Sequence, residues 1–315
     1  MKTGQSVGII GGGVVGGAVK HFFKEAKVYD KYKDSDSIED VARARFIFIC
    51  VPTPFKSTDS HGLSPQMTTD EISGNPSQNQ RESVVKNQWK SVFTEGSLDI
   101  SIVDEVVADL SKILPDPANQ LVVIKSTALP GTTQKYQDKY PELNFAFNPE
   151  FLRDKTANED FVKNDRQIVG YTDKTKDSQL IKELLSVLPP APYQKIVSSE
   201  VAEMIKYAGN TFLALKVIFA NQIYDACQAY GLDYDEVKKG VISDKRIGKS
   251  HWEILHTESS LGEKTEDVYR GYGGKCFPKD INSLIAMSKD LKVDLGLFEA
   301  GREVNLDLNA GKYDD

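Results

Sequence analysis

The feature that most constrains the fold of this chain is a glycine-rich turn that follows a short apolar strand near the N-terminus. Residues 6–10 read Ser-Val-Gly-Ile-Ile, and Gly11-Gly-Gly-Val-Val-Gly16 follows with the spacing GxGxxG. A short helix is expected over residues 18–27, and a second strand opens at Val28 and ends at Asp30. A strand, a glycine turn, a helix and a second strand that ends in an acid are typical of dinucleotide-binding proteins.

Each glycine of this turn has a separate expected role. Gly11 permits the tight turn, Gly13 lets the backbone approach a pyrophosphate, and Gly16 allows the helix to pack closely on the strand. The helix N-terminus offers N–H donors to the phosphate. Asp30 can accept hydrogen bonds from both ribose hydroxyls, and its charge would repel a 2′-phosphate. The turn therefore predicts a site for NAD rather than NADP.

Strands and helices continue to alternate along the first two thirds of the chain. Apolar, β-rich runs occupy residues 46–51, 121–126, 145–147 and 167–170, and helical patterns accompany them at 102–114 and 178–188. Buried parallel strands that alternate with helices predict a doubly wound α/β fold with a Rossmann-like parallel sheet. We assign residues 1–197 to this NAD-binding domain.

A polar segment interrupts this alternation. Seventeen of the 24 residues at 57–80 are Ser, Thr, Asn, Gln, Gly or Pro, which leaves too few apolar groups to offset the entropy of ordering the segment. We interpret residues 56 to about 96 as an insertion, with one short helix near 83–93. A surface loop is the simpler interpretation, and a lid over a substrate or partner is the alternative.

The last third of the chain has a long helical pattern. From Ser199 to Tyr230, apolar residues recur every three or four positions, which predicts a helix of about 45 Å. Further helices are expected at 234–242 and 280–291. A helix as long as the first often runs between domains or forms an oligomer interface. We assign residues 198–300 to a central helical domain for dimerisation and residues 301–315 to a tail.

Composition and charge exclude several classes of function. The chain has 39 Lys and Arg against 46 Asp and Glu, a net charge of −7 without a basic run, which argues against nucleic-acid binding. No apolar stretch approaches the roughly 20 residues of a membrane span. The three cysteines show no disulfide or CxxC pattern, which favours the cytoplasm. We expect no metal site, and we interpret His251 and His256, five residues apart, as surface residues.

One cysteine lies where a nucleophile is expected. Cys276 stands between a glycine-rich turn and a helix that should begin near residues 278–279, with Lys275 and Lys279 close by. A helix N-terminus and neighbouring ammonium groups favour the thiolate. Cys50 lies in an apolar strand and Cys227 inside the long helix, so we expect both to be inert core residues.

Six segments of the chain carry a specific resemblance. They are Val51-Pro-Thr53-Pro, Lys125-Ser-Thr127-Ala-Leu-Pro-Gly131-Thr-Thr, Asn148-Pro-Glu150-Phe-Leu-Arg-Asp154, Glu203-Met-Ile-Lys206-Tyr-Ala-Gly-Asn210-Thr-Phe-Leu-Ala, Arg246-Ile-Gly248 and Gly-Gly-Lys-Cys276-Phe-Pro-Lys-Asp280. Together they resemble the motifs of the UDP-glucose/GDP-mannose dehydrogenase family, and most of all its short members that oxidise UDP-glucose. The resemblance covers nearly the whole chain outside the insertion.

This resemblance implies an NAD-dependent, four-electron oxidation of a nucleotide sugar's primary alcohol to a carboxylate, UDP-glucose to UDP-glucuronate. Cys276 would trap the aldehyde as a thiohemiacetal, which a second oxidation converts to a thioester that water cleaves. A homodimer through the 199–230 helix is also implied. UDP-N-acetylhexosamine or GDP-mannose is the alternative substrate, and a non-catalytic NAD-binding dimer is the alternative of another class.

The resemblance further implies roles for individual residues. Lys206 matches a lysine that stabilises negative charge on oxygen or moves the alcohol proton, and Asp280 matches a carboxylate that helps to position water. The implied catalytic set is Cys276, Lys206, Asn210, Asp280, Thr127 and Glu150. The implied cofactor contacts beyond the glycine turn and Asp30 are Val15, Thr53, Thr127, Asp154 and Lys279. The implied substrate contacts are Glu150, Phe151, Leu152, Arg153, Lys206, Asn210, Gly273 and Arg246, the last reaching the partner subunit's sugar site.

Three features depart from the family's pattern. Residues 249–270 replace the usual substrate-loop sequence, and Asp154 stands where glutamate is usual. The chain also ends at Asp315, whereas longer members continue with a third, nucleotide-covering domain. These departures leave the choice of base and sugar weakly constrained.

Overall fold

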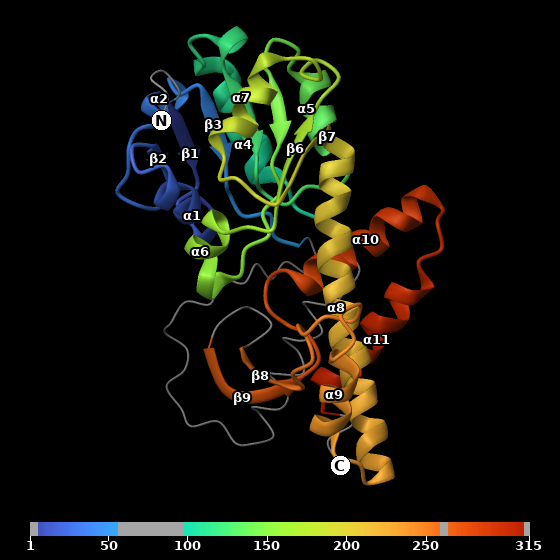
Figure 1. Ribbon diagram of the computed structural model, residues 1–315. Coiled ribbons are helices and arrows are strands. Elements are labelled where there is room, and N and C mark those ends of the chain that lie inside the picture. Colours follow the sequence, from blue (N-terminus) through green and yellow to red (C-terminus); the bar gives the residue numbers. More distant parts are fainter. Residues whose placement is uncertain (1–5, 56–97, 259–263, 312–315) are drawn as a thin grey trace, which may run out of the picture. The chain divides into compact units, whose positions relative to one another are not determined.

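The computed structural model describes residues 6–55, 98–258 and 264–311 (Figure 1). The chain divides into two compact units, the first made of residues 1–54 and 98–206 and the second of residues 55–97 and 207–315. The division falls inside one long helix, between Lys206 and Tyr207. The expected polar insertion at 56–96 lies outside the described residues.

The first unit is built on a seven-stranded sheet with the order β2-β1-β3-β4-β5-β6-β7. Neighbouring strands are parallel except at β5 and β6, which are antiparallel. One row of the register runs from Ile9 through Phe48 and Val123 to Ala146. The strands are β1 (Val7–Ile10), β2 (Lys27–Tyr29), β3 (Phe46–Ile49), β4 (Leu121–Ile124), β5 (Phe145–Phe147), β6 (Arg166–Tyr171) and β7 (Tyr193–Ser198).

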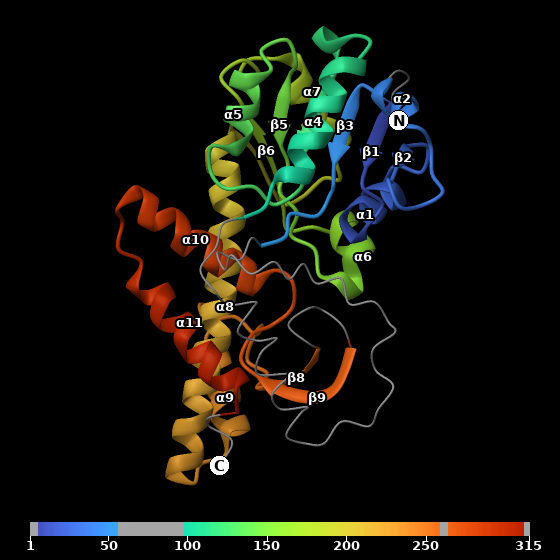
Figure 2. The same cartoon turned by 180° about the vertical axis from the view of Figure 1, so that it is seen from behind.

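Helices cover both faces of this sheet, as the two opposite views show (Figures 1 and 2). One apolar core joins the sheet to α1 (Val14–Phe22), α6 (Ala157–Val162) and α7 (Gln179–Val187). The other joins it to α2 (Ile38–Ala42), α4 (Ser101–Ile113), α5 (Thr132–Lys139) and the first turns of α8 (Ser199–Tyr230). Each fully buried Phe or Ile in these cores contributes about 1.5–3 kcal/mol. The doubly wound α/β prediction is confirmed.

Two local expectations for this unit differ from the structure. The first helix begins at Val14, not at residue 18, because Gly13 is already extended and acts as its N-cap. Strand β7 was not predicted at all. Its first three residues are exposed, so Tyr193–Ser198 lacks the continuous apolar run that marks the buried strands.

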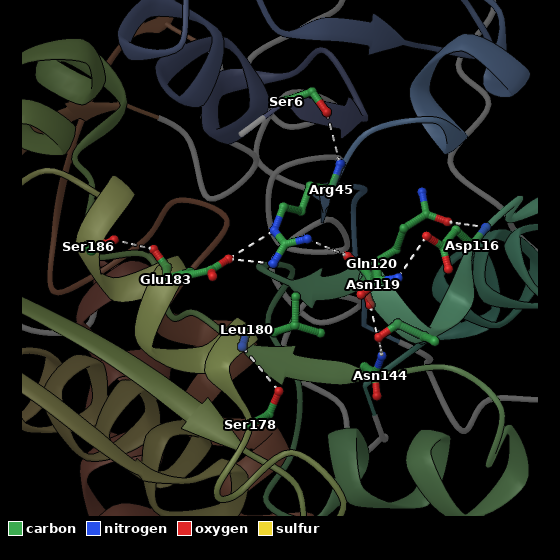
Figure 3. Close-up of polar contacts among 11 residues, drawn as sticks. Ser6, Arg45, Asp116, Asn119, Gln120, Asn144, Ser178, Leu180, Glu183 and Ser186 are labelled. Carbon is green, nitrogen blue, oxygen red and sulfur yellow. Dashed lines mark hydrogen bonds and ion pairs between the residues drawn. The ribbon is translucent and has the colours of Figure 1, made fainter. Parts of the chain in front are cut away.

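A polar network ties together the ends of the strands that lie away from the glycine turn (Figure 3). The Arg45 guanidinium donates twice to Glu183 Oε2, at 2.9 and 2.6 Å, and its backbone N–H donates to Ser6 Oγ. Gln120 donates to the carbonyls of residues 42 and 44, and Asn144 donates to that of Gln120. Arg45, Gln120 and Asn144 directly precede β3, β4 and β5, so structural hydrogen bonds close the amino edge of the sheet. Ligands of such sheets bind at the opposite, carboxyl edge.

The second unit is mostly helical. Ala214, Val217 and Ile218 of α8 form a core with residues of the two C-terminal helices. Cys227 and Trp252 belong to a second cluster of buried residues. The remaining elements are α9 (Tyr234–Ile242), β8 (Leu255–Glu258), β9 (Lys264–Arg270), α10 (Phe277–Leu291) and α11 (Gly296–Asn309).

The bounds of α8 and α9 are those the sequence predicts, and α10 begins at Phe277, one to three residues before the expected starts at 278–280. Residues 249–270, which replace the usual substrate-loop sequence, contain the antiparallel strands β8 and β9. The residues assigned to a tail from 301 form most of α11, which packs against α10 and β9. No helix within the described ranges is both long and apolar enough to cross a membrane.

Candidate active site

The geometry of the glycine turn accounts for all three glycines. Gly11 has a φ of +98°, and a Cβ there would lie 2.7 Å from the Cys50 carbonyl oxygen. A Cβ on Gly16 would lie 1.8 Å from the Gly11 carbonyl oxygen, so only glycine lets α1 pack this closely. A Cβ on Gly13 would meet nothing within 4 Å. The backbone at Gly13 therefore faces open space, where a pyrophosphate fits, at the N-terminus of α1.

Asp30 is held against this turn. Its Oδ2 accepts a hydrogen bond from Gly12 N at 2.7 Å, and its Oδ1 accepts one from Tyr32 N at 3.0 Å. The N–H of Tyr32, with that of Gly12, lowers the pKa of Asp30 below its ordinary value although burial opposes the shift. Lys33 Nζ donates to the Gly12 carbonyl at 2.6 Å, a contact that the sequence analysis missed. The carboxylate stays ionised and oriented beside the glycine turn.

The ends of β3 and β4 carry two of the predicted cofactor contacts. Thr53 is buried and Thr127 half-buried. Ser126 Oγ donates to the Val51 carbonyl at 2.7 Å, which joins the two segments that follow these strands. Val15, in the first turn of α1, is half-buried.

Glu150 and Lys206 form a buried ion pair within the first unit. The Lys206 ammonium donates to Glu150 Oε1, and Leu152 N donates to Glu150 Oε2 at 2.9 Å. The two side chains are only 5% and 11% exposed. Burial would raise the pKa of Glu150, but the Lys206 charge and its hydrogen bond outweigh burial and hold the pKa below the ordinary value. The structure thus brings together two residues that the sequence placed 56 positions apart.

Two further charged groups surround this pair. Lys125, at the end of β4, is 2% exposed, and its ammonium donates to Asn148 Oδ1 at 2.8 Å. Burial lowers the pKa of Lys125 to about 8. Glu203, one turn before Lys206 on α8, accepts hydrogen bonds from Gly131 N and from both the backbone N–H and the hydroxyl of Thr133.

The sequence analysis assigned no individual role to Lys125 or Glu203. Both residues stand in the motifs quoted above, and their place in these motifs was the sequence signal that could have marked them as site residues. The structure shows that Lys125 is a buried cation and that Glu203 is an N-terminal anchor for α5.

In the second unit, Cys276 is the N-cap residue of α10 and is exposed, whereas Cys50 and Cys227 are buried. The Cys276 carbonyl accepts the backbone N–H of Asp280 at 2.9 Å, which closes the first helical turn. The sulfur therefore lies at the positive end of a 15-residue helix. Burial raises the pKa of Cys50 to about 12, which fits an inert thiol.

Asp280 is fully buried between two predicted site residues. Asn210 Nδ2 donates to Asp280 Oδ2 at 2.6 Å, and Lys279 Nζ donates to Asp280 Oδ1 at 2.7 Å. Lys206 and Asn210 are four residues apart on α8, so they lie one helical turn apart.

The turn before Cys276 is anchored at both ends. Arg270 is buried and pairs with Asp225 of α8 at 2.5 Å. The buried Asn305 side chain bonds both the N–H and the carbonyl of Tyr272. A Cβ on Gly273 would lie 2.7 Å from the Tyr269 hydroxyl, so this predicted substrate contact also needs glycine for packing.

Other predicted substrate residues have protein partners. Arg153 is 78% exposed and bonds Asp160, and Arg246 is 88% exposed and bonds Asp244. The Arg166 guanidinium covers the ring of Phe151 at 3.8 Å. Leu152 is half-buried and Asp154 is exposed.

Known proteins are similar in sequence to most of this chain. UDP-glucose 6-dehydrogenase of Rickettsia bellii is 34% identical over 209 residues, 65% of this chain and 44% of that protein. UDP-glucose 6-dehydrogenase YwqF of Bacillus subtilis is 31% identical over 265 residues, 84% of this chain and 49% of that protein. The chain therefore spans about half the length of the curated relatives it matches.

The solved structure of a UDP-glucose dehydrogenase from Pyrobaculum islandicum is similar at a TM-score of 0.68 and 26% identity, covering 97% of this chain and 69% of that one. The NAD-binding-domain model of one family matches residues 90–188, and the central-domain model of the same family matches residues 200–307. The match to the NAD-binding-domain model begins at residue 90, so it does not include the glycine turn at residues 11–16. The strand, turn and helix there have the geometry of a dinucleotide-binding site. The chain belongs to the UDP-glucose/GDP-mannose dehydrogenase family.

Proposed function

We propose that this chain catalyses the NAD-dependent, four-electron oxidation of the primary alcohol of a nucleotide sugar, with UDP-glucose as the substrate. The observation that carries the proposal is an exposed Cys276 at the N-terminus of α10, next to the buried Asp280–Asn210 contact. Relatives named as UDP-glucose dehydrogenases favour that sugar nucleotide over the alternatives. We assign the activity to the cytoplasm, because the three cysteines show no disulfide pattern.

The residues at the glycine turn fit NAD. The open space at Gly13, the α1 N-terminus and the ionised Asp30 suit a pyrophosphate and a ribose with a free 2′-hydroxyl. Val15, Thr53, Thr127, Asp154 and Lys279 are the proposed further contacts. When bound, NAD accepts a hydride at each of the two oxidations.

The chain's own residues have the following proposed roles. Lys206 stabilises the negative charge that develops on the alcohol oxygen or moves the alcohol proton, and Asn210 donates a hydrogen bond to the same oxygen. The thiol of Cys276 adds to the aldehyde carbon and forms a C–S bond, which gives a thiohemiacetal. Oxidation of this species leaves a thioester, and water cleaves its C–S bond, releasing the carboxylate and returning the thiol. Asp280, Glu150 and Thr127 are the residues that we assign to positioning that water.

We also propose that Glu150, Phe151, Leu152, Arg153 and Gly273 contribute to sugar binding. To bind substrate, Arg153 would have to leave Asp160 and contact substrate oxygens. Its side chain is 78% exposed and therefore has room to turn.

A homodimer through α8 completes the proposal. Phe212 and Phe219, two turns apart on this helix, are 62% and 53% exposed, an apolar surface that a second α8 can cover. Arg246 is exposed like Arg153, so it could leave Asp244 to bind a substrate. We assign it to the partner's sugar site. Phe212→Glu is expected to give monomers in sedimentation velocity, with Gln222→Glu on the same helix as the control. A Phe212→Glu protein that stays dimeric contradicts the assignment of α8 to the interface.

The deciding experiment measures NADH production with UDP-glucose, GDP-mannose and UDP-N-acetylhexosamines. We expect two NADH per UDP-glucose and none from Cys276→Ser, while Cys227→Ala, which removes a buried thiol elsewhere, keeps activity. Limited treatment with iodoacetamide should label one thiol, Cys276, and activity should fall in proportion to labelling. Turnover with another nucleotide sugar alone would make that sugar the substrate in place of UDP-glucose. NAD binding without any turnover would support the non-catalytic dimer.

A further inference from the structure

Lys125 is a buried cation that the proposed mechanism does not use. Its side chain lies inside the first unit, 2% exposed, although a lysine is among the residues least often found fully buried. The acceptors that the described part of the chain offers its ammonium are Asn148 Oδ1 at 2.8 Å and, at 3.4 Å, the carbonyls of Asn148 and Pro149. All three are neutral oxygens. Such a group costs free energy to bury, so it calls for a reason beyond stability.

The acceptors of Lys125 directly precede Glu150 in the chain. Asn148 is fully buried and is itself fixed, since its side-chain amide donates to Gln167 Oε1 at 3.0 Å and to the Ile168 carbonyl at 2.7 Å. Lys125 therefore fastens the Asn148–Pro149 segment from β4, and the next side chain along, Glu150, contacts Lys206. The contacts form one continuous path from β4 to α8 within a single compact unit.

The charges around Lys125 act on the same pair. The titratable groups that face it are Cys50 after β3, Glu150 after β5 and Lys206 on α8, and the ring of Phe161 on α6 lies 5.2 Å from its nitrogen. Lys125 favours the ionised form of Glu150 and disfavours a second positive charge on Lys206. The pair and Lys125 together carry two lysines against one carboxylate.

We propose that Lys125 is a positioning residue, which holds Glu150 against Lys206 through the Asn148–Pro149 segment and biases the protonation of that pair. The catalytic half of this inference rests on the proposed function. The structural half, an energetic coupling between Lys125 and Glu150, does not.

The first test compares Lys125→Met and Lys125→Gln with Lys112→Met, which removes an exposed surface lysine. Both Lys125 variants should lower kcat by about tenfold with little change in KM. The limbs of the kcat/KM profile that report Glu150 and Lys206 should move up by about half a pH unit, because a nearby positive charge is lost. Lys125→Gln keeps a donor for Asn148, so it should lose less kcat than Lys125→Met but show the same shift. Folded variants with wild-type kcat and pH profile would overturn the proposal, as would failure of both to fold while Lys112→Met folds.

The second test needs no activity. A double-mutant cycle of Lys125→Met and Glu150→Gln, measured by urea unfolding, should be non-additive, with the double variant losing less stability than the two single losses combined. Additive losses would overturn the proposal even if the enzyme is active. If the wild-type protein turns over no nucleotide sugar but the cycle is non-additive, the proposed function is wrong and the coupling between Lys125 and Glu150 still holds.

Discussion

The glycine turn allows three neighbouring Gly→Ala substitutions to be predicted with three different outcomes. A Cβ on Gly16 would lie 1.8 Å from a backbone oxygen, whereas ordinary contact begins near 3.4 Å, so α1 would have to move away from the turn. Overpacking of this kind costs about 1–3 kcal/mol when side chains can yield. Because the obstacle here is backbone, we expect Gly16→Ala to lose at least about 3 kcal/mol and its NAD binding.

Gly17 is the matched control, one residue further along the same helix. It is exposed, and a Cβ there would meet nothing within 4 Å. Gly17→Ala should stabilise α1 by about 0.5–1 kcal/mol, the ordinary gain in helix propensity. Gly13→Ala should leave stability within about 0.5 kcal/mol, since its Cβ also points into open space. It should nevertheless weaken NAD binding, because that space is where we place the pyrophosphate.

Urea unfolding and calorimetric NAD titration of the three variants separate these outcomes. Equal stability of Gly16→Ala and Gly17→Ala would refute the close-packing argument. Unchanged NAD affinity in Gly13→Ala would refute the placement of the cofactor at this turn.

Three further changes test how much buried polar contacts at the proposed site contribute to the free energy of unfolding. Asp280→Ala strands the Lys279 ammonium and the Asn210 amide, so urea unfolding should show a loss of about 3 kcal/mol; a loss comparable with an ordinary surface change would contradict the described ion pair. Asn305→Leu leaves the N–H of Tyr272 unpaired in a buried turn and leaves its carbonyl only the 3.4 Å contact from Asn309 Nδ2, so it should cost about 2 kcal/mol, with faster iodoacetamide labelling of Cys276 as the second readout; unchanged labelling would argue that this anchor does not order the turn. The pKa of Lys125 is lowered from 10.5 to about 8 by burial, so the unfolded chain binds more protons between these values and stability should rise with pH across that window. The free energy of unfolding of wild type should accordingly rise relative to that of Lys125→Met by roughly 3 kcal/mol from pH 8 to 10.5, and a difference independent of pH would show that Lys125 is not buried as a cation.

Much of the fold follows from local pattern. Continuous apolar runs identified the central strands of the sheet, and a regular three-to-four spacing identified α8 to its end residues. The elements that escaped prediction lack such a pattern. Strand β7 is half exposed, the β8–β9 hairpin lies in a polar segment, and α11 follows a stretch that reads as a tail.

The candidate site divides in the same way. The sequence proposed Cys276 from its place before a helix, and the family resemblance proposed Lys206 and Asp280; these assignments stay predictions. Their partners could not be read from the chain. Arg153 and Arg246 were expected to reach a substrate, yet each has a carboxylate a few residues away that holds it in this structure.

Sequence alone determined which chemistry is possible, since glycine spacing, an acid after the second strand and a cysteine before a helix are properties of neighbouring residues. Tertiary structure decided which groups share an environment: that Glu150 meets Lys206, that Asp280 meets Asn210, and that Lys125 is buried beside an ion pair. The reason is physical. A charge's neighbours and its exposure to water depend on segments far away in the chain, and these two quantities set its protonation and its partners.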